Sequence, residues 1–261
     1  MSHSTHGSVS QTYVEALLSG DRVMSRLVID KALTTGSEPM ELLNNLVWPT
    51  MELLQQLYRD DRINIAMLNL ATRLNRSLTD QLTAQLPRKA QNGKQVLIFC
   101  GSAEPEELGG QICADLFEAD GYTVRFAGGG VPDDEVLKLI GDLRPDLLVM
   151  FATLPSGVPS VRKLVDYLRE VNSCPEMQIM CCGGIYKRAE GLAEEIGADL
   201  YAPDASTAVE VANGNRSKKA SLDQQTVGRT RRIKQAASRK TTKATRSTKS
   251  ATPTLRIHKA A

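Results

Sequence analysis

The sequence predicts an α/β protein of two modules: an N-terminal four-helix bundle that forms a cap, and a doubly wound, flavodoxin-like parallel sheet of five strands. Residues 10–86 carry apolar side chains at helical spacing throughout. Residues 95–212 alternate short apolar runs with helical stretches, which is typical of a parallel sheet covered on both faces. Residues 213–261 show no periodicity and an excess of basic side chains, which predicts a disordered tail.

The cap is expected to begin after a short polar segment, 1–9, that we predict to be disordered. Asp21 stands where an N-cap residue would begin the second helix, and Pro39 stands in the first turn of the third. Apolar residues recur at helical spacing between and beyond these two positions. The expected helices cover about 10–19, 21–35, 37–57 and 62–86.

A linker at 87–94 is expected to separate the cap from the second module, which spans 95–212. Parallel sheets of this kind bind ligands at the carboxyl ends of their strands, and the loops there are rich in Gly, Ser, Pro and Thr. The expected strands are 95–100, 122–126, 146–151, 177–182 and 198–201, and the expected helices are 106–120, 133–142, 157–171, 186–195 and 205–212.

The histidines lie outside both predicted modules. The chain has three, His3, His6 and His258, in the two segments that we predict to be disordered. Their positions exclude Ser-His-Asp and Cys-His catalysis and histidine-based metal ligation within the modules. We find no other catalytic set, and we therefore expect a protein that is not an enzyme.

Cysteine usage and hydropathy indicate the compartment. The five cysteines are odd in number and include no Cys-x-x-Cys pair. The N-terminus lacks the basic region and apolar run of a signal peptide, and no stretch of about eighteen apolar residues is present. We expect a reduced, cytoplasmic protein without a membrane segment.

The net charge of +2 conceals an uneven distribution. Residues 213–261 hold 14 Lys and Arg against one acidic residue, whereas the rest of the chain holds 18 basic and 29 acidic residues. One interpretation is that the tail binds DNA or RNA through phosphates, without reading sequence. Contact with the acidic body or with a protein partner, and a tail with no specific role, are the alternatives.

Several short motifs occur in an order that resembles a known family. The stretches GDRVMSRLVIDKAL and INIAMLNLAT fall in the predicted cap. Glu104-Pro105-Glu106-Glu107-Leu108-Gly109 follows the first strand, Cys182-Gly183-Gly184 ends the fourth, and Gly197-Ala198-Asp199 precedes the fifth. In this order they resemble the cobalamin-binding module of methionine synthases, corrinoid carrier proteins and cobalamin-dependent photoreceptors, over about residues 10–212.

The resemblance implies a corrinoid site and also shows where this chain departs from it. The family has Asp-x-His-x-x-Gly after the first strand, and its histidine coordinates cobalt. Here Glu104 and Glu106 stand at the Asp and His positions. A carboxylate is a hard oxygen donor, whereas cobalt in corrinoids favours nitrogen. The resemblance also places Ala152 at a serine position after the third strand, with Thr153 beside it as a remaining hydroxyl.

On the cap side, the resemblance implies that Tyr58 replaces a tryptophan and that Leu68 and Asn69 replace a Glu-His pair above the corrin. The glycines of the family's motifs, in contrast, are present in this chain. The family's dimethylbenzimidazole tail lies between the sheet and the helices at positions that correspond to small residues of this chain. These are Gly109, Gly128, Gly183 and Gly184. The alternative is that such glycines only make turns between strands and helices.

Three functions remain open at this point. The first is a cobalamin-binding sensor or regulator without the axial histidine, which binds adenosyl- or methylcobalamin, acts on a protein partner or on transcription, and could associate with itself through the cap. The second is a degenerate scaffold that no longer binds cobalamin and whose basic tail contacts nucleic acid. The third is a corrinoid methyl-carrier protein, which the missing histidine disfavours.

Overall fold

The computed structural model describes residues 3–221, with side chains from Ser10 onward. Expectations for the tail beyond residue 221, including its contact with nucleic acid, lie outside the described residues. Within the described residues, no helix combines the length and apolar composition that a membrane crossing requires.

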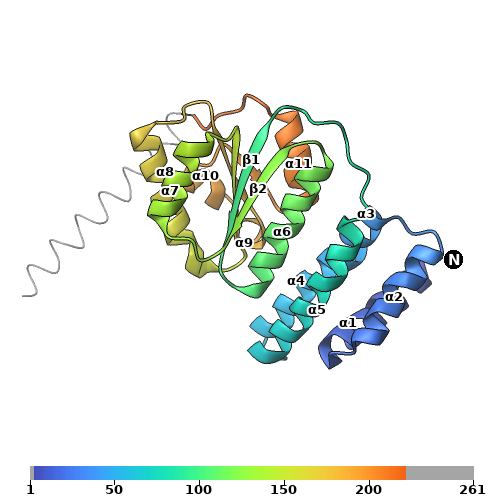
Figure 1. Cartoon of the computed structure of the whole chain (residues 1–261). Helices are drawn as coiled ribbons and strands as arrows, with labels where there is room; N and C mark the ends of the chain where they lie inside the picture. The colour runs from blue at the N-terminus through green and yellow to red at the C-terminus, as the bar shows by residue number, and fades with distance from the viewer. Residues whose placement is uncertain (1–2, 222–261) are drawn as a thin grey trace, which may run out of the picture.

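Five strands form one parallel sheet in the order β2-β1-β3-β4-β5, which confirms the flavodoxin-like topology (Figure 1). Strand order reverses between β1 and β3, so the loops that follow these two strands diverge and leave a crevice at the carboxyl edge. The strands are β1 (Gln95–Cys100), β2 (Thr123–Gly128), β3 (Leu147–Phe151), β4 (Gln178–Cys182) and β5 (Leu200–Ala202).

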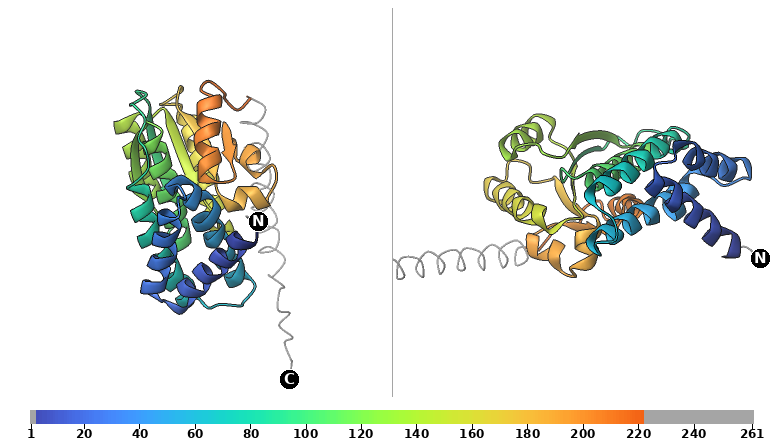
Figure 2. Two further views of the ribbon diagram at one scale, coloured as in Figure 1. Left: turned by 90° about the vertical axis from the view of Figure 1, so that its right-hand side faces the viewer. Right: turned by 90° about the horizontal axis from the view of Figure 1, so that it is seen from below.

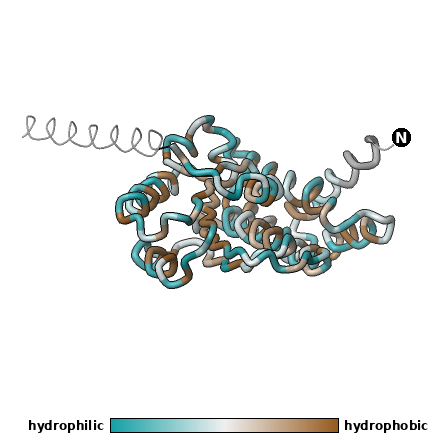
Figure 3. The backbone as a smooth tube through the Cα atoms, turned by 90° about the horizontal axis from the view of Figure 1, so that it is seen from above, coloured by the Kyte–Doolittle hydropathy of each residue, from teal (hydrophilic) through white to brown (hydrophobic). Residues whose placement is uncertain are grey.

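Alternate side chains of the strands enter two separate apolar clusters. Val96 and Ile98 of β1 join the cluster that contains α6 (Glu104–Ala119), α11 (Ala205–Gly214) and the cap, whereas Leu97 and Phe99 join the opposite one. Apolar colouring is concentrated on the strands in the middle of the molecule (Figure 3). The opposite cluster is closed by α7 (Asp133–Leu143), α8 (Val158–Val171), α9 (Gly184–Arg188) and α10 (Leu192–Ile196).

The cap lies against α6 and consists of helices only. Helix α5 (Ile65–Thr83) packs on α6, α4 (Trp48–Arg59) contacts both, and the pair α1 (His3–Ser19) and α2 (Arg22–Thr34) lies on the side of α5 away from the sheet (Figures 1 and 2). The Asp21 carboxylate accepts a hydrogen bond from the Met24 N–H at 2.9 Å, which confirms it as the N-cap of α2.

A π-helical turn interrupts the long third helix of the cap. Helix α3 (Pro39–Leu42) continues through the π turn η1 (Leu43–Val47) directly into α4. Pro49 lies in the first turn of α4, where it has no N–H to donate and its ring would crowd an ordinary preceding turn. The wider turn accommodates the ring and also rotates the following side chains around the helix axis. It therefore decides which residues of α4 face the sheet.

At both ends, regular structure extends beyond the expected boundaries of the two modules. The segment 1–9, predicted to be disordered, contributes helix α1 from His3. At the other end, α11 continues to Gly214, past the expected boundary at 212/213. The Gln178 side chain then donates to the backbone oxygens of Asn215 and Lys218, and the Ala220 N–H donates to Asp199. Hydrogen bonds between its backbone and buried side chains hold this segment. They join residues far apart in the chain, so the spacing of apolar residues does not predict them.

Asp115 is a half-buried carboxylate on α6, at the interface with α5. Its pKa is raised from 3.8 to about 6, mainly because burial disfavours the charged form. The nearby carboxylates of Asp80 and Glu118 also raise the pKa, whereas a hydrogen bond with Thr83 and the charge of Arg88 lower it. A carboxyl whose pKa is higher in the folded state favours folding only while protonated. The stability that Asp115 contributes is therefore lost as the pH rises from about 4 to about 6.

We expect Asp115→Asn to raise the melting temperature at pH 7.5 by about 2–4 °C. This corresponds to about 1 kcal/mol, after allowance for solvent screening of a half-buried carboxylate. The gain should vanish at pH 4, where wild-type Asp115 is largely protonated. Thermal melts at both pH values test this, with Asp142→Asn on the exposed side of α7 as the control. An equal gain at the two pH values would contradict it.

Candidate functional site

Glu106 lies at the crevice between β1 and β3. Its side chain is 4% exposed, and its Oε1 accepts hydrogen bonds from the backbone N–H groups of Thr153 (2.7 Å) and Leu154 (3.0 Å). The carboxylate thus holds the loop that follows β3 against the N-terminus of α6. Because both bonds are made to backbone groups, Glu106 has a structural role at the position where the resemblance expected a cobalt ligand.

Gly101 allows Glu106 to take this position. A Cβ atom at residue 101 would lie 1.9 Å from Oε2 of Glu106, so any other residue there would collide with the carboxylate. Gly101 was not among the site residues expected from the sequence. The sequence feature that could have indicated it is its position directly after the first strand and shortly before the acidic stretch.

The two neighbouring carboxylates point to other partners. Glu104 forms ion pairs with Arg73 (3.1 Å) and Arg76 (3.4 Å) of α5, and so ties the sheet module to the cap. Glu107 accepts a hydrogen bond from the Gly129 N–H (2.7 Å) after β2. The three carboxylates diverge, and no group of His, Cys, Asp or Glu in the described part of the chain is arranged to hold a metal ion.

The thiols of Cys100 and Cys181, within the last two residues of β1 and β4, are partly and fully buried, respectively, and both are neutral. Burial raises the pKa of the Cys181 thiol to about 12 and that of the Cys100 thiol even further, with a smaller contribution from Glu107 to the latter. Thiolates bind metals, whereas neutral thiols do so poorly. These side chains therefore act as small apolar groups.

Phe151 ends β3 and fills the space between the glycines of α6 and β4. Its side chain is 1% exposed. A Cβ atom on Gly109 would lie 2.3 Å from its Cζ, and one on Gly183 would lie 3.1 Å from its Cε2. Trp48 meets the same ring edge-on, with 6.0 Å between the ring centroids. Both glycines were expected at the site from the sequence, whereas Phe151 and Trp48 were not among the expected site residues.

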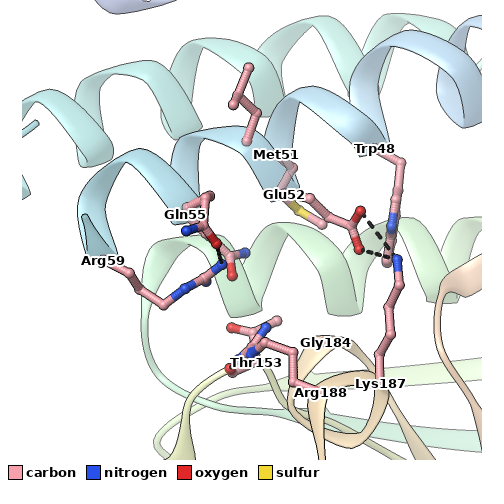
Figure 4. Close-up of a pocket in the computed structure, with 11 residues that line it drawn as sticks. Trp48, Met51, Glu52, Gln55, Arg59, Thr153, Gly184, Lys187 and Arg188 are labelled. Atoms are coloured by element: carbon pink, nitrogen blue, oxygen red, sulfur yellow. Dashed lines mark hydrogen bonds and ion pairs between the residues drawn. The ribbon is translucent and has the colours of Figure 1, made fainter. Parts of the chain in front are cut away.

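A cleft of about 310 Å³, called here the cap cleft, separates α4 from the loops after β3 and β4. On its upper side lie Trp48, Met51, Glu52, Gln55 and Arg59, and on its lower side Thr153, Gly184, Lys187 and Arg188 (Figure 4). The Glu52–Lys187 ion pair (3.1 Å) closes one side. Two buried polar atoms in the lining have no hydrogen-bond partner: Nε1 of Trp48 and Oγ1 of Thr153.

The structure brings together only some of the residues that the resemblance indicated. Thr153 and Gly184 line the cap cleft, and Glu106, Gly109 and Gly183 lie just below it. Glu104 and Gly128 lie farther out: Glu104 faces the cap arginines, and a Cβ atom on Gly128 would meet the Glu107 carboxylate at 3.3 Å.

The expected cap residues do not line the cleft. Tyr58 is 38% exposed, to one side of the stripe that runs from Trp48 to Arg59. Leu68 is buried in the cap core, and Asn69 follows it on α5, also outside the cleft lining. For Tyr58 the π turn before Trp48 is the physical reason, because it sets which face of α4 meets the sheet. Leu68 and Asn69 lie on a different helix, whose apolar stripe packs into the cap core.

Ala152 also differs from its expected place. It packs into the apolar cluster on the opposite face of the sheet from α6, because side chains alternate along a strand. The residue that faces α6 is therefore Phe151, one position earlier than the resemblance indicated.

Two family models, each described as a B12 binding domain, match residues 9–83 and 94–212. The chain belongs to the B12-binding domain family. The two matches correspond to the cap and the sheet module, and together they include both sides of the cap cleft.

Proteins similar to this chain include corrinoid proteins of Methanosarcina species. Dimethylamine corrinoid protein 1 of Methanosarcina mazei is 22% identical over 201 residues, which are 76% of this chain and 92% of that protein. Trimethylamine corrinoid protein of Methanosarcina barkeri is 22% identical over 198 residues, or 75% and 90% of the two chains. The structure of the Methanosarcina barkeri monomethylamine corrinoid protein shares the fold, with a TM-score of 0.68, 18% identity and coverage of 77% and 94%.

A cobalamin fits the cap cleft only in part. The cap cleft lies at the carboxyl edge of the sheet, and its two unpaired polar atoms match the amide groups around a corrin ring. The position of the axial ligand does not fit, because Glu106 is an oxygen donor already bonded to two backbone N–H groups. The expected space for the nucleotide tail does not fit either, because Phe151 occupies it.

Proposed function

We propose that this protein holds a corrinoid between α4 of the cap and the carboxyl edge of the sheet, and presents it to a partner protein without catalysing a reaction of its own. The observation that carries the proposal is the cap cleft with two unpaired buried polar atoms, Trp48 Nε1 and Thr153 Oγ1. Buried polar atoms almost always have partners, so two unpaired ones in residues that line the same cleft favour a ligand with polar groups there.

The carrier class is preferred over a regulator of transcription. The similar proteins are corrinoid proteins named for methylated amines, and they match both modules of this chain. A regulator was expected to act on a protein partner or on transcription, and the basic tail that could contact DNA lies, beyond residue 221, outside the described residues. The cofactor class proposed here is a cobalamin or a related corrinoid, and the site shows no preference between the adenosyl and methyl forms.

Binding requires the cap to move. Pockets for drug-sized ligands have volumes of about 300–1,000 Å³, and a cobalamin is larger than such ligands, so 310 Å³ is too small for its ring. The polar ties across the boundary are mostly exposed: Glu52 with Lys187, Asn44 with Ser206, and Arg73 with Glu104. Exposed ion pairs contribute about 0–1 kcal/mol each, so they oppose opening only weakly.

The test is retention of a corrinoid by the full chain. We expect the protein, incubated with hydroxocobalamin or methylcobalamin and desalted, to keep the visible absorbance of the corrinoid in the protein fraction. Gly184→Phe should weaken binding by at least about tenfold, because its ring would fill the cap cleft. A Cβ atom at Gly184 first meets only the flexible end of Arg188, so the variant should fold.

Gly141→Phe is the matched control, because Gly141 lies exposed on α7 with open space beside it. It should bind as the wild type does. A colourless wild-type fraction, or equal retention by the two variants, would overturn the proposal.

A further inference from the structure

The phenyl ring of Phe151 is held from three sides. The backbone of α6 approaches it at Gly109, the end of β4 approaches it at Gly183, and the Trp48 ring meets it from the cap. A Cβ atom would lie 2.3 Å from the ring at Gly109 and 3.1 Å from it at Gly183, so a side chain at either position would press on the ring; at Gly183 the Ala152 backbone oxygen is nearer still, at 2.6 Å. We call this space, bounded by Gly109 and Gly183, the phenyl slot.

The backbone that carries the ring cannot move aside. Phe151 belongs to β3, which pairs with β1 on one side and with β4 on the other. The Gly101 N–H donates to the Phe151 oxygen (3.3 Å), and the Ala152 N–H donates to the Cys182 oxygen (2.9 Å). A buried aromatic side chain in a close-packed interior has few alternative rotamers, so the ring stays in the slot.

We infer that Phe151 closes the space where a nucleotide base would insert, so that this protein accepts corrinoids whose base stays on cobalt or is absent, as in cobinamide. The inference rests on the proposed function for its ligand. The phenyl ring and a benzimidazole are both flat aromatic groups, and the slot has room for one. Gly109 therefore makes room for a side chain of the protein instead of a ligand, and Gly183, whose φ of +109° and contact with the Ala152 oxygen already require a glycine, leaves the other side of the slot open to the same ring.

Glu106 supports the same conclusion from the floor of the cap cleft. Both hydrogen bonds to its Oε1 come from the loop after β3, so the carboxylate is engaged and buried. Leaving these N–H groups unpaired would cost free energy, so Glu106 stays bound to the loop. A cobalamin that keeps its own base on cobalt needs no axial ligand from the protein.

The first experiment compares cobalamin with cobinamide on the wild-type full chain. We expect dissociation constants within about threefold of each other, because the base adds no contact. The visible spectrum of bound cobalamin should be that of the form with its base on cobalt. A preference for cobalamin above tenfold, or a bound spectrum with the base off cobalt, would overturn the inference.

The second experiment needs no corrinoid. Phe151→Ala should leave an apolar cavity that binds free 5,6-dimethylbenzimidazole, as engineered apolar cavities bind small aromatic molecules. The ligand should raise the melting temperature of this variant by roughly 2 °C or more and leave the wild type unchanged. Phe99→Ala removes a buried ring on the opposite face of the sheet and should show no such shift. Phe151→Leu serves if the alanine variant does not fold, because it leaves a smaller cavity that should give a smaller shift.

The two proposals fail separately. If the wild type binds neither corrinoid but a Phe151 variant binds the free base, the proposed function is wrong and the closed slot stands. If the wild type binds cobalamin with its base off cobalt, the proposed function stands and the closed slot is wrong. If no folded Phe151 variant binds the free base, the slot is not the space for a base.

Discussion

Asp199→Ala is expected to lower the free energy of unfolding by about 3–5 kcal/mol. The Asp199 side chain is fully buried, and it forms an ion pair with Arg169 at 2.8 Å. It also accepts hydrogen bonds from the backbone N–H groups of Ile179 (2.8 Å) and Ala220 (2.7 Å). Removing the carboxylate leaves the mostly buried Arg169 without its counter-charge and two N–H groups without acceptors. Urea denaturation at pH 7 measures the loss.

Asp146→Ala is the control for Asp199, because Asp146 has an equivalent place before β3. It accepts a hydrogen bond from the Gln95 N–H and pairs with Lys94, but its side chain is 39% exposed. Its loss should cost about 1 kcal/mol. Asp199→Ala should also speed tryptic cleavage after Lys218 and Lys219, because the bond that holds Ala220 is lost. Equal costs for the two variants, with no change in cleavage, would contradict the role given to Asp199.

Glu106→Ala is expected to lower the free energy of unfolding by about 3 kcal/mol. The substitution removes the acceptor of two backbone N–H groups, those of Thr153 and Leu154, and leaves a cavity beside Gly101. The position is only 4% exposed, so water has little access to the two N–H groups, and leaving them unpaired costs free energy. The measurement is again urea denaturation at pH 7.

Glu106→Gln should recover at least half of this loss, because its amide oxygen can accept the same two hydrogen bonds. Glu107→Ala is the matched control: its carboxylate accepts one backbone N–H, that of Gly129, and it is only half-buried. About 1 kcal/mol is expected there. If Glu106→Ala were as stable as the wild type to within about 0.5 kcal/mol, Glu106 would not hold the loop.

The order and type of the elements could be predicted because each depends on local properties of the chain. Apolar residues at helical spacing define the cap helices, and short runs such as 95–100 and 147–151 are apolar on both faces, as central parallel strands must be. The N-cap at Asp21 is also a local hydrogen bond within one turn. Features of this kind need no knowledge of what packs against them.

The candidate site could be located at the strand ends but not assembled in detail. Phe151 and Ala152 are both apolar neighbours, and only the register of β3 in the sheet decides which of them faces α6. On α4, the π turn ahead of Pro49 turns Trp48 toward the sheet and leaves Tyr58 at the side. A shift of one residue changes the outcome in both cases, and the spacing of residues cannot resolve such a shift.

The sequence by itself determined the two modules, the parallel sheet and the absence of histidine from the family's ligand position, because periodicity and residue identity are properties of the chain alone. Only the tertiary structure decided what occupies the space that those residues leave. It placed the phenyl ring of Phe151 between Gly109 and Gly183, and the carboxylate of Glu106 against two backbone N–H groups. Close packing and the pairing of buried polar groups join residues far apart in the chain, and neither acts before the chain has folded.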